Sequence, residues 1–319
     1  METTTLILST SPHIKGRETV PKIMLSVVIT LVPAIAYSIY QFGLYTLALY
    51  VVSVATCLAA EYLVVRLRKR PFTLTDYSAL LTGILLVMVL PPRFPIYGVI
   101  LGAVVAIVIG KQIFGGLGYN IFNPALIGRA FLAATYPVYI SSYIAPKLGA
   151  NAVSAATPLA SMKFDGVVTP LKPLFFGMTG GSIGETSAFL LIVGSLYLIA
   201  KKYVKWRIPA SIFLTVFVLG EIFHLINPDQ YPSGFFHLCA GGLMIGGLYM
   251  ATDMVTSPLT KRGCVIFGAG IGVLVIIIRI FGGLPEGVMY AILFMNALVP
   301  LINRATKPRI FGTGSKNEQ

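Results

Sequence analysis

Ten apolar runs, separated by short polar or basic stretches, constrain this chain more than any other feature of its sequence. A bilayer has a hydrocarbon core of about 30 Å, which a helix of roughly 20 apolar residues can span. The pattern therefore predicts an all-α polytopic membrane protein with about ten transmembrane helices. The predicted spans are residues 22–42, 44–65, 77–91, 96–111, 123–140, 187–201, 208–226, 235–251, 264–281 and 286–302.

Several of these runs, the third, fourth, fifth and eighth, are short or contain Gly and Pro. Non-helical backbone at membrane depth is tolerated only where it faces protein or a cavity, and matching interrupted segments are typical of transporter binding sites. Thr75-Asp76 opens the third run, and Thr252-Asp253 closes the eighth. This repeated Thr-Asp pair favours two five-helix repeats. Because five is an odd number, the second repeat would have to insert into the membrane in the opposite orientation.

Lysine and arginine set the predicted orientation. Charged residues are only 11% of the chain and hydrophobic residues are 56%, whereas soluble proteins carry about 25% charged residues. The net charge of +13 therefore indicates basic loops on one side of a membrane rather than nucleic-acid binding. With a cytoplasmic N-terminus, 18 basic residues fall inside and 5 outside, while Arg129 lies within a span.

This division predicts one integral membrane domain, residues 1–319, in the cytoplasmic membrane with both termini inside. Its parts follow the chain in order: a cytoplasmic tail at 1–21, a first helix group at 22–140, an extracytoplasmic loop at 141–186, a second helix group at 187–302 and a cytoplasmic tail at 303–319.

Residues 110–132 are rich in Gly and Asn and contain the intramembrane Arg129. A charge at membrane depth needs a partner or a ligand. Arg129 therefore indicates an anionic ligand, a structural ion pair or a role in capping the carbonyl groups of a broken helix. Asn123-Pro124 is typical of a helix N-terminus, with Asn as the cap and Pro at the first helical position. Such a terminus, aimed into a cavity, would attract anionic groups.

Three further features are weaker candidates for a site. The glycine-rich stretch at 178–187 offers Thr179, Ser182 and Glu185 as hydrogen-bonding groups, although a simple loop explains it equally well. Asp76 and Asp253 stand at the predicted inner ends of short spans. Each is either a local cap or a cation-binding group on a transport path.

The longest polar interval holds the stretch NAVSAATPLASMK, residues 151–163. Because a residue before proline is pushed toward extended geometry, we expect the side chain of Thr157 to stand off the backbone with an accessible hydroxyl.

No metal site or hydrolytic catalytic group is predicted. The three cysteines lie far apart without a CxxC pattern, which indicates buried, inert thiols rather than a cluster or zinc site. The three histidines lack metal-ligand spacing. These residues are Cys57, Cys239, Cys264, His13, His224 and His237.

Several motifs occur together and in order, and jointly they resemble a known family. They are TDYSALLTGILLVMVLPP, GKQIFGGLGYNIFNPALIGRAF, SAATPL, GSIGETS and ATDMVTSPLTKRG. The chain is similar over essentially its whole length to the D subunits of Rnf complexes, which are membrane-bound ferredoxin:NAD oxidoreductases that move ions. That family also includes the B subunit of the sodium-translocating NADH:quinone oxidoreductase.

The resemblance implies FMN attached through its phosphate to a threonine in an S-G-A-T pattern. Ser154 and Thr157 match the motif's serine and its attachment residue, while Ala155 replaces the glycine. It also implies a ten-helix fold similar to urea transporters, a second, noncovalent flavin (riboflavin) and modification by a flavin transferase. Its partners would be iron–sulfur, flavin and NAD-binding subunits, membrane lipid, and Na⁺ or H⁺.

The leading interpretation is an electron carrier that is not catalytically complete alone, because the chain has no nicotinamide fold. Arg129, Asn123, Thr179 and Glu185 are the candidate flavin neighbours, and Asp76 and Asp253 the candidate ion-handling residues. Two alternatives stay open: a urea-channel-like transporter and a non-redox membrane scaffold. A covalent flavin on Thr157 would distinguish the electron carrier from both.

Overall fold

The computed structural model describes residues 18–70, 73–146, 156–185, 187–228 and 230–308, and the regular elements within them are helical. The first group runs α1 (Val20–Phe42), α2 (Leu44–Leu67), the single turn η1 (Leu74–Asp76), α3 (Ser78–Met88), α4 (Ile96–Ile107), its π-helical continuation η2 (Val108–Gln112), α5 (Pro124–Thr135) and α6 (Pro137–Ile140). Ser154 and Ala155 lie outside the described residues.

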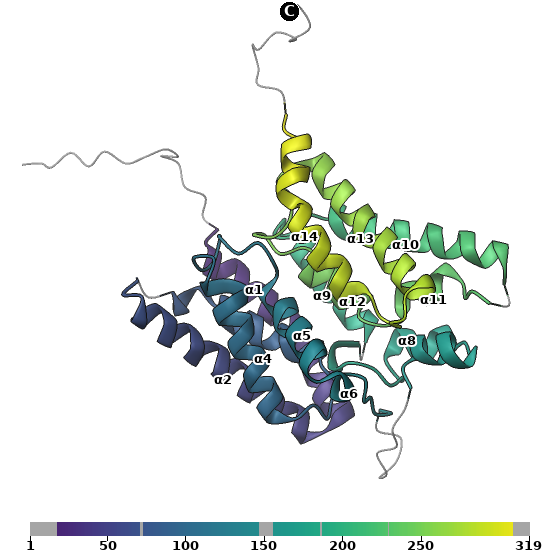
Figure 1. Ribbon diagram of the computed structural model, residues 1–319, viewed down its shortest axis with the longest axis horizontal. Coiled ribbons are helices and arrows are strands. Elements are labelled where there is room, and N and C mark those ends of the chain that lie inside the picture. Colours follow the sequence, from purple (N-terminus) through teal and green to yellow (C-terminus); the bar gives the residue numbers. More distant parts are fainter. Residues whose placement is uncertain (1–17, 71–72, 147–155, 186, 229, 309–319) are drawn as a thin grey trace, which may run out of the picture.

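Short helices connect the two groups: α7 (Pro158–Ala160), the π-helical η3 (Ser161–Asp165), α8 (Leu171–Phe176) and η4 (Ile183–Glu185). The second group comprises α9 (Ala188–Ala200), α10 (Arg207–Ile226), α11 (Gly234–Cys239), α12 (Leu243–Ile245), η5 (Gly246–Met250), α13 (Lys261–Phe281) and α14 (Val288–Ala305). In Figure 1 the end of α14 lies at the top of the view, and α6 and α8 lie in its lower part.

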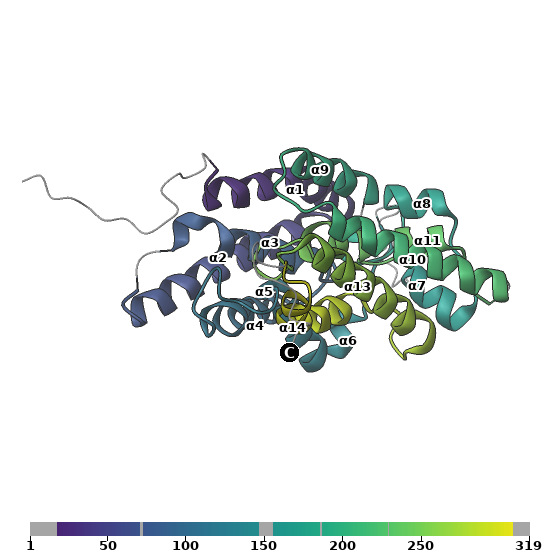
Figure 2. The same cartoon turned by 90° about the horizontal axis from the view of Figure 1, so that it is seen from above.

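The helices of the two groups pack in corresponding arrangements. In the first, α2 packs on α3 and α4; in the second, α10 packs on α11 and α13. Figure 2 shows α2 and α4 at one side, α10 and α13 at the other, and α1 beside α9 and α5 beside α14 between them. Small residues permit the close approaches: a Cβ on Gly194 of α9 would lie 2.7 Å from the carbonyl oxygen of Thr30 on α1.

Five helices, α1, α2, α10, α13 and α14, are long and apolar enough to cross a membrane. The helices α3, α5, α9 and the continuous α4–η2 are apolar but shorter. The eighth run is divided into α11, α12 and η5 rather than forming one span. The chain is therefore a multi-pass membrane protein, and the count of ten spans stays a prediction.

The predicted fifth span, 123–140, is wrong as a single helix. Helix α5 ends at Thr135, Tyr136 adopts φ −129° and ψ 57°, and a new helix begins at Pro137. Proline lacks a backbone N–H and disfavours helical geometry in the residue before it, so the helix breaks there.

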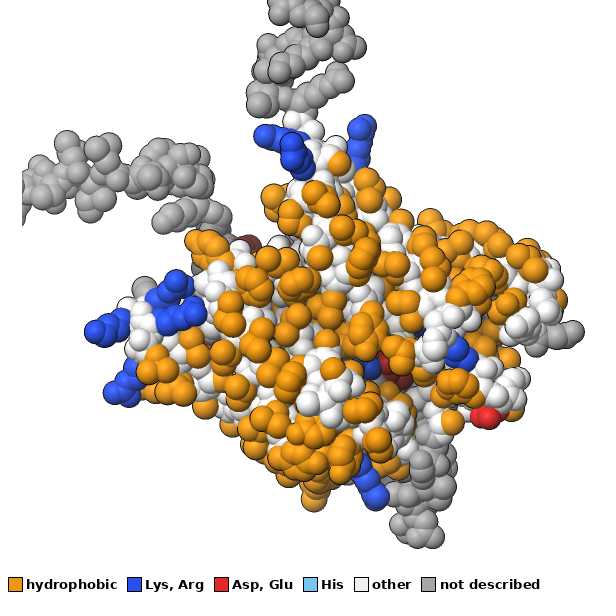
Figure 3. Space-filling model, viewed as in Figure 1, with side chains coloured by type: hydrophobic (Ala, Val, Ile, Leu, Met, Phe, Trp, Pro, Cys, Tyr) orange, Lys and Arg blue, Asp and Glu red, His pale blue; other side chains and the backbone are white. Residues whose placement is uncertain are grey.

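The surface has the character expected of a membrane protein. Figure 3 shows apolar side chains over most of the visible face, with much of the Lys and Arg gathered toward its upper and left extremities. Exposed large apolar residues occur on every long helix, including Leu44 at 78%, Leu225 at 78% and Leu301 at 62%. In water such a surface would aggregate, whereas hydrocarbon solvates it.

Candidate functional site

Arg129 of α5 forms a partly buried ion pair with Glu286, which precedes α14 by two residues. The Arg129 Nη2 to Glu286 Oε2 distance is 2.6 Å, and Glu286 Oε1 accepts a second hydrogen bond from the backbone N–H of Gly242 at 2.6 Å. The partner is 157 residues away in sequence. The structural ion pair, one of the expected roles of Arg129, is present.

Glu185, Ser182 and Tyr143 surround this pair. Ser182 Oγ donates to Glu185 Oε1 at 2.7 Å, and Tyr143 interacts with Ser182, Glu286 and Arg129. We call these five residues the Arg129 cluster. A cavity of about 170 Å³ opens beside it, lined by Arg129, Tyr143, Glu286 and Tyr290 among others.

Glu185 and Glu286 lie close together in the Arg129 cluster, with the guanidinium groups of Arg129 and Arg279 nearby. Glu286 is engaged in the ion pair. Burial of Glu185 away from water, together with repulsion from the Glu286 carboxylate, raises the pKa of Glu185 to about 8. A neutral carboxyl group is cheaper to bury than a charged one. Burial in the cluster therefore favours the protonated form of Glu185 more than water does.

A raised pKa makes native stability depend on pH. The folded state holds the Glu185 proton more tightly than the unfolded state, so its stabilising effect is complete below pH 4.5 and is lost as pH rises toward about 8. We expect the unfolding temperature of the detergent-solubilised protein to fall less between pH 6 and 9 in Glu185→Gln than in wild type. Glu18→Gln, at an exposed glutamate, is the control; equal slopes in all three proteins would contradict this account.

Thr157 lies at the N-terminus of α7. Its backbone is extended, with φ −70° and ψ 153°, and its hydroxyl oxygen accepts a hydrogen bond from Ala160 N at 3.2 Å. The residue is only 8% exposed, so the expectation of an accessible hydroxyl is wrong. The predicted extended geometry is correct, but capping turns the side chain back toward the helix.

The segment after Thr157 packs close to the Arg129 cluster. Leu159 is buried with Leu174, Phe236 and Ala240. A Cβ on Gly241 would lie 2.5 Å from Leu159 Cδ1 and 3.5 Å from Glu286 Oε1. Leu159 and Glu286 thus both lie close to Gly241.

Asn123 caps α5 as predicted: its Oδ1 accepts from Ala125 N at 3.0 Å, with Pro124 at the first helical position. Six residues separate Asn123 from Arg129 along the helix, or about 9 Å at 1.5 Å per residue. Asn123 instead lines a second cavity with Lys111, Asn120 and Asp253, which we call the Lys111 cavity.

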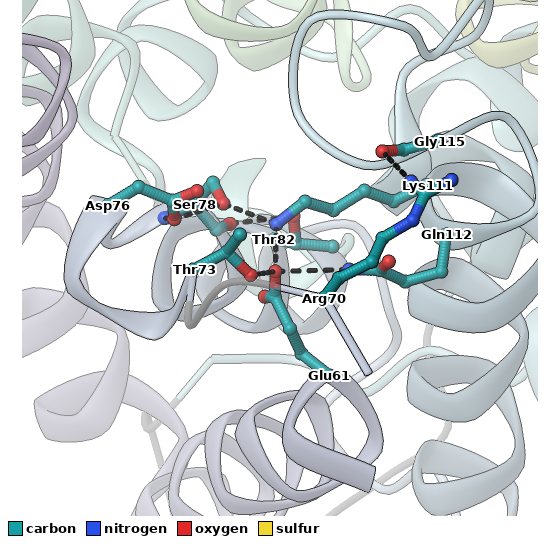
Figure 4. A network of polar contacts seen from close by, with 9 residues as sticks. All are labelled: Glu61, Arg70, Thr73, Asp76, Ser78, Thr82, Lys111, Gln112 and Gly115. Carbon is teal, nitrogen blue, oxygen red and sulfur yellow. Dashed lines mark hydrogen bonds and ion pairs between the residues drawn. The ribbon is translucent and has the colours of Figure 1, made fainter. Parts of the chain in front are cut away.

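The Lys111 cavity adjoins a buried polar network that no sequence motif marks (Figure 4). Lys111 Nζ lies 2.7 Å from Glu61 Oε1, with side chains 1% and 0% exposed. Glu61 Oε1 also accepts from Thr73 Oγ1 at 2.9 Å and Gln112 Nε2 at 3.1 Å, and Lys111 donates to Ser78 Oγ. The network joins α2, α3 and η2, and its one signal in the sequence is a lone Glu inside an apolar run.

Asp76 and Asp253 have different surroundings. Asp76 Oδ1 accepts from Ser78 N at 2.8 Å and from Ser78 Oγ at 2.5 Å, which makes it a local cap for the start of α3. Asp253 lines the Lys111 cavity, and its Oδ2 accepts from Thr256 Oγ1 at 3.3 Å. Of the two, Asp253 is the one placed on a cavity.

The remaining sequence-predicted residues are only partly placed. Thr179 is half-buried before η4, and within the described residues no hydrogen bond joins it to the Arg129 cluster. Glu286 was missed, although it is the single acidic residue opening the last apolar run. The searched, described residues contain no group of three or more His, Cys, Asp or Glu able to hold a metal ion.

The residues near Thr157 fit a phosphate-linked flavin in chemistry. Thr157 offers a hydroxyl before the short helix α7. The neighbouring cluster supplies Tyr143, Arg129 in its ion pair with Glu286, and a cavity that Thr157 itself does not line. The buried hydroxyl requires the segment to move for attachment. The Lys111 cavity suits a second flavin less well. Asn120 Oδ1 is a buried acceptor without a partner in the described residues, but the cavity volume is about 70 Å³, against about 170 Å³ beside the Arg129 cluster. Both cavities are small beside the ~300–1,000 Å³ of ligand pockets.

Comparison with known proteins identifies relatives along the whole chain. Residues 7–312 match the NQR2, RnfD, RnfE family. The D subunit of the proton-translocating ferredoxin:NAD(+) oxidoreductase complex of Clostridium ljungdahlii is 46% identical over 96% of each chain. The D subunit of the Na(+)-translocating complex of Acetobacterium woodii is 43% identical over 96% of this chain and 95% of that one. The D subunit of the ion-translocating oxidoreductase complex of Stutzerimonas stutzeri is 38% identical over 95% of each.

Proposed function

Because this chain belongs to the NQR2, RnfD, RnfE family, we propose that it is the electron-carrying membrane subunit of an ion-translocating ferredoxin:NAD oxidoreductase complex. The observation that carries the proposal is the match along 96% of the chain to the D subunits of two such complexes. Those relatives are named for H⁺ and for Na⁺, so either ion suits the proposal. Other subunits of the complex would supply the NAD and iron–sulfur sites.

We propose that Thr157 holds FMN through a phosphoester, attached by a flavin transferase. Bound there, FMN would supply the electron-transfer chemistry. The chain's own contribution is position and charge: Leu159 docks the segment beside Gly241, and Arg129 provides a fixed cation nearby. Ser154 completes the motif in sequence, and Glu185 offers a carboxyl group, with a raised pKa, in the same cluster.

For ion handling we propose Asp253 ahead of Asp76, since only Asp253 lines the Lys111 cavity. Asp76 is engaged with Ser78 at the start of α3. Riboflavin stays part of the proposal because of the family resemblance, and no residue is assigned to it.

We further propose that the two helix groups are inverted repeats in the cytoplasmic membrane. In the first group α2 packs on α4, and in the second group α10 packs on α13; this correspondence supports the division. The basic-residue split supports cytoplasmic termini and an extracytoplasmic Thr157 segment.

The orientation predicts opposite labelling of two exposed lysine positions. A cysteine replacing Lys172, on α8, should react with a membrane-impermeant maleimide added outside intact cells. A cysteine replacing Lys307, beyond α14, should react only after the membrane is opened. The reverse pattern would overturn the proposed orientation.

The proposed function is tested in inverted membrane vesicles from cells lacking this chain and from cells in which it is restored. Reduced ferredoxin should drive NAD reduction and ion uptake only in the restored vesicles. A urea-channel-like protein would instead raise the urea permeability of liposomes containing the purified chain. Unchanged NAD reduction without the chain would contradict the proposal.

A further inference from the structure

Lys163, in η3, reaches across to the end of α13. Its Nζ donates to the backbone carbonyl oxygens of Arg279 at 2.9 Å and Leu284 at 3.1 Å, lies 3.5 Å from that of Ile278, and also donates to that of Gly282. The last carbonyl groups of a helix have no partner within it, and a cation is favoured there. An ammonium group has three N–H donors, so these carbonyls can occupy all of them.

This contact holds the Thr157 segment against the joined ends of α11 and α13, where Leu159 also packs. Arg279 of α13 donates from Nη1 to His237 O at 2.5 Å and from Nη2 to Ala240 O at 2.8 Å, which joins α13 to the end of α11. Leu159 packs against Ala240. The short helix carrying Thr157 is therefore held at two points, one apolar and one charged, on a single rigid pair of helices.

The docked segment closes Thr157 to large reagents, because the residue is only 8% exposed and its oxygen is engaged with Ala160 N. A modifying enzyme needs a solvent-accessible hydroxyl group. The same residue therefore requires two arrangements: one open for modification, and the docked one seen here, beside the Arg129 cluster.

We propose that Lys163 is the positioning residue that docks residues 157–165 on the end of α13, and that release of this contact exposes Thr157. The docking stands on the contacts above; its meaning for flavin attachment rests on the proposed function. Lys163 acts through the segment that it holds and needs no contact with the flavin.

The test measures accessibility at position 157 without any flavin. In full-length chain in membranes, Thr157→Cys is exposed to a maleimide, and labelling at that position is followed by peptide mass spectrometry. Adding Lys163→Met should raise the labelling rate about tenfold, which corresponds to about 1.4 kcal/mol in the opening equilibrium. Lys163→Arg, which brings five N–H donors, should return the rate toward that of Thr157→Cys alone.

Two controls separate release from unfolding. Lys172→Met removes an exposed lysine of the same loop and should leave the rate unchanged. Cys57 and Cys264, which are 0% and 2% exposed, should stay unlabelled throughout. If Lys163→Met does not accumulate, Lys163→Gln, which keeps an N–H donor without the charge, should give an intermediate rate.

Equal labelling rates for Thr157→Cys with and without the Lys163→Met substitution would overturn the proposal, as would rapid labelling of Thr157→Cys alone. Absence of flavin from the wild-type chain would remove the proposed function but leave the order of labelling rates intact. The two failures are therefore distinguishable.

Discussion

Replacing Thr157 by alanine should abolish ferredoxin-dependent NAD reduction in membranes that otherwise contain the whole complex. Alanine has no hydroxyl, so no phosphoester can form at position 157. By our proposal the electron path passes through the flavin held there, and its loss interrupts that path. The measurement is the rate of NAD reduction by reduced ferredoxin, normalised to the amount of chain in the membrane.

A second substitution separates the hydroxyl from the cap. Thr157 caps α7, and loss of an N-cap costs about 0.5–2 kcal/mol, so alanine could act through structure. Thr157→Asn keeps a side-chain acceptor for the cap but cannot form the ester. We expect it to be as inactive as Thr157→Ala, while Thr135→Ala, at an exposed threonine, stays active. An active Thr157→Asn protein would contradict the assignment.

Removing the ammonium group of Lys111 should have the largest effect on stability. Lys111→Met leaves the fully buried Glu61 carboxylate without its cation, with Thr73 and Gln112 as its remaining donors among the described residues. Breaking a buried ion pair in this way costs about 3–5 kcal/mol, a large fraction of a typical protein's total stability. We expect a low yield of folded protein and a sharply lower unfolding temperature in detergent.

The double variant Glu61→Gln with Lys111→Met should recover most of this loss, because no uncompensated charge remains. Lys22→Met is the matched control: it breaks an exposed pair with Glu18, whose side chains are 55% and 49% exposed, and such surface pairs contribute little. A double variant no more stable than Lys111→Met alone would show that the network stabilises the fold through something other than charge balance.

The elements that could be predicted from sequence are those with local causes. Asn123-Pro124 favours a helix start through local capping, and the extended backbone of Thr157 follows from Pro158. The long apolar helices follow from their composition. Arg129 was recognisable as a residue needing compensation because a charge in a membrane is costly anywhere.

What could not be predicted depends on contacts distant in sequence. No local pattern pairs Arg129 with Glu286, or Lys111 with Glu61, because each pair forms only when separate helices meet. The burial of Thr157 has the same origin, since Leu159 packs against α8 and α11. The break at Pro137 was overlooked because apolar residues continue on both sides of it.

The most direct test of the central claim is the intact mass of the purified chain, produced together with its flavin transferase. The wild-type chain should be heavier than its sequence by FMN less water and should fluoresce as a band in a denaturing gel under ultraviolet light. Thr157→Ala should have the unmodified mass and no fluorescence. A wild-type chain at its unmodified mass, or a Thr157→Ala chain that keeps the added mass, would contradict covalent flavin attachment at Thr157.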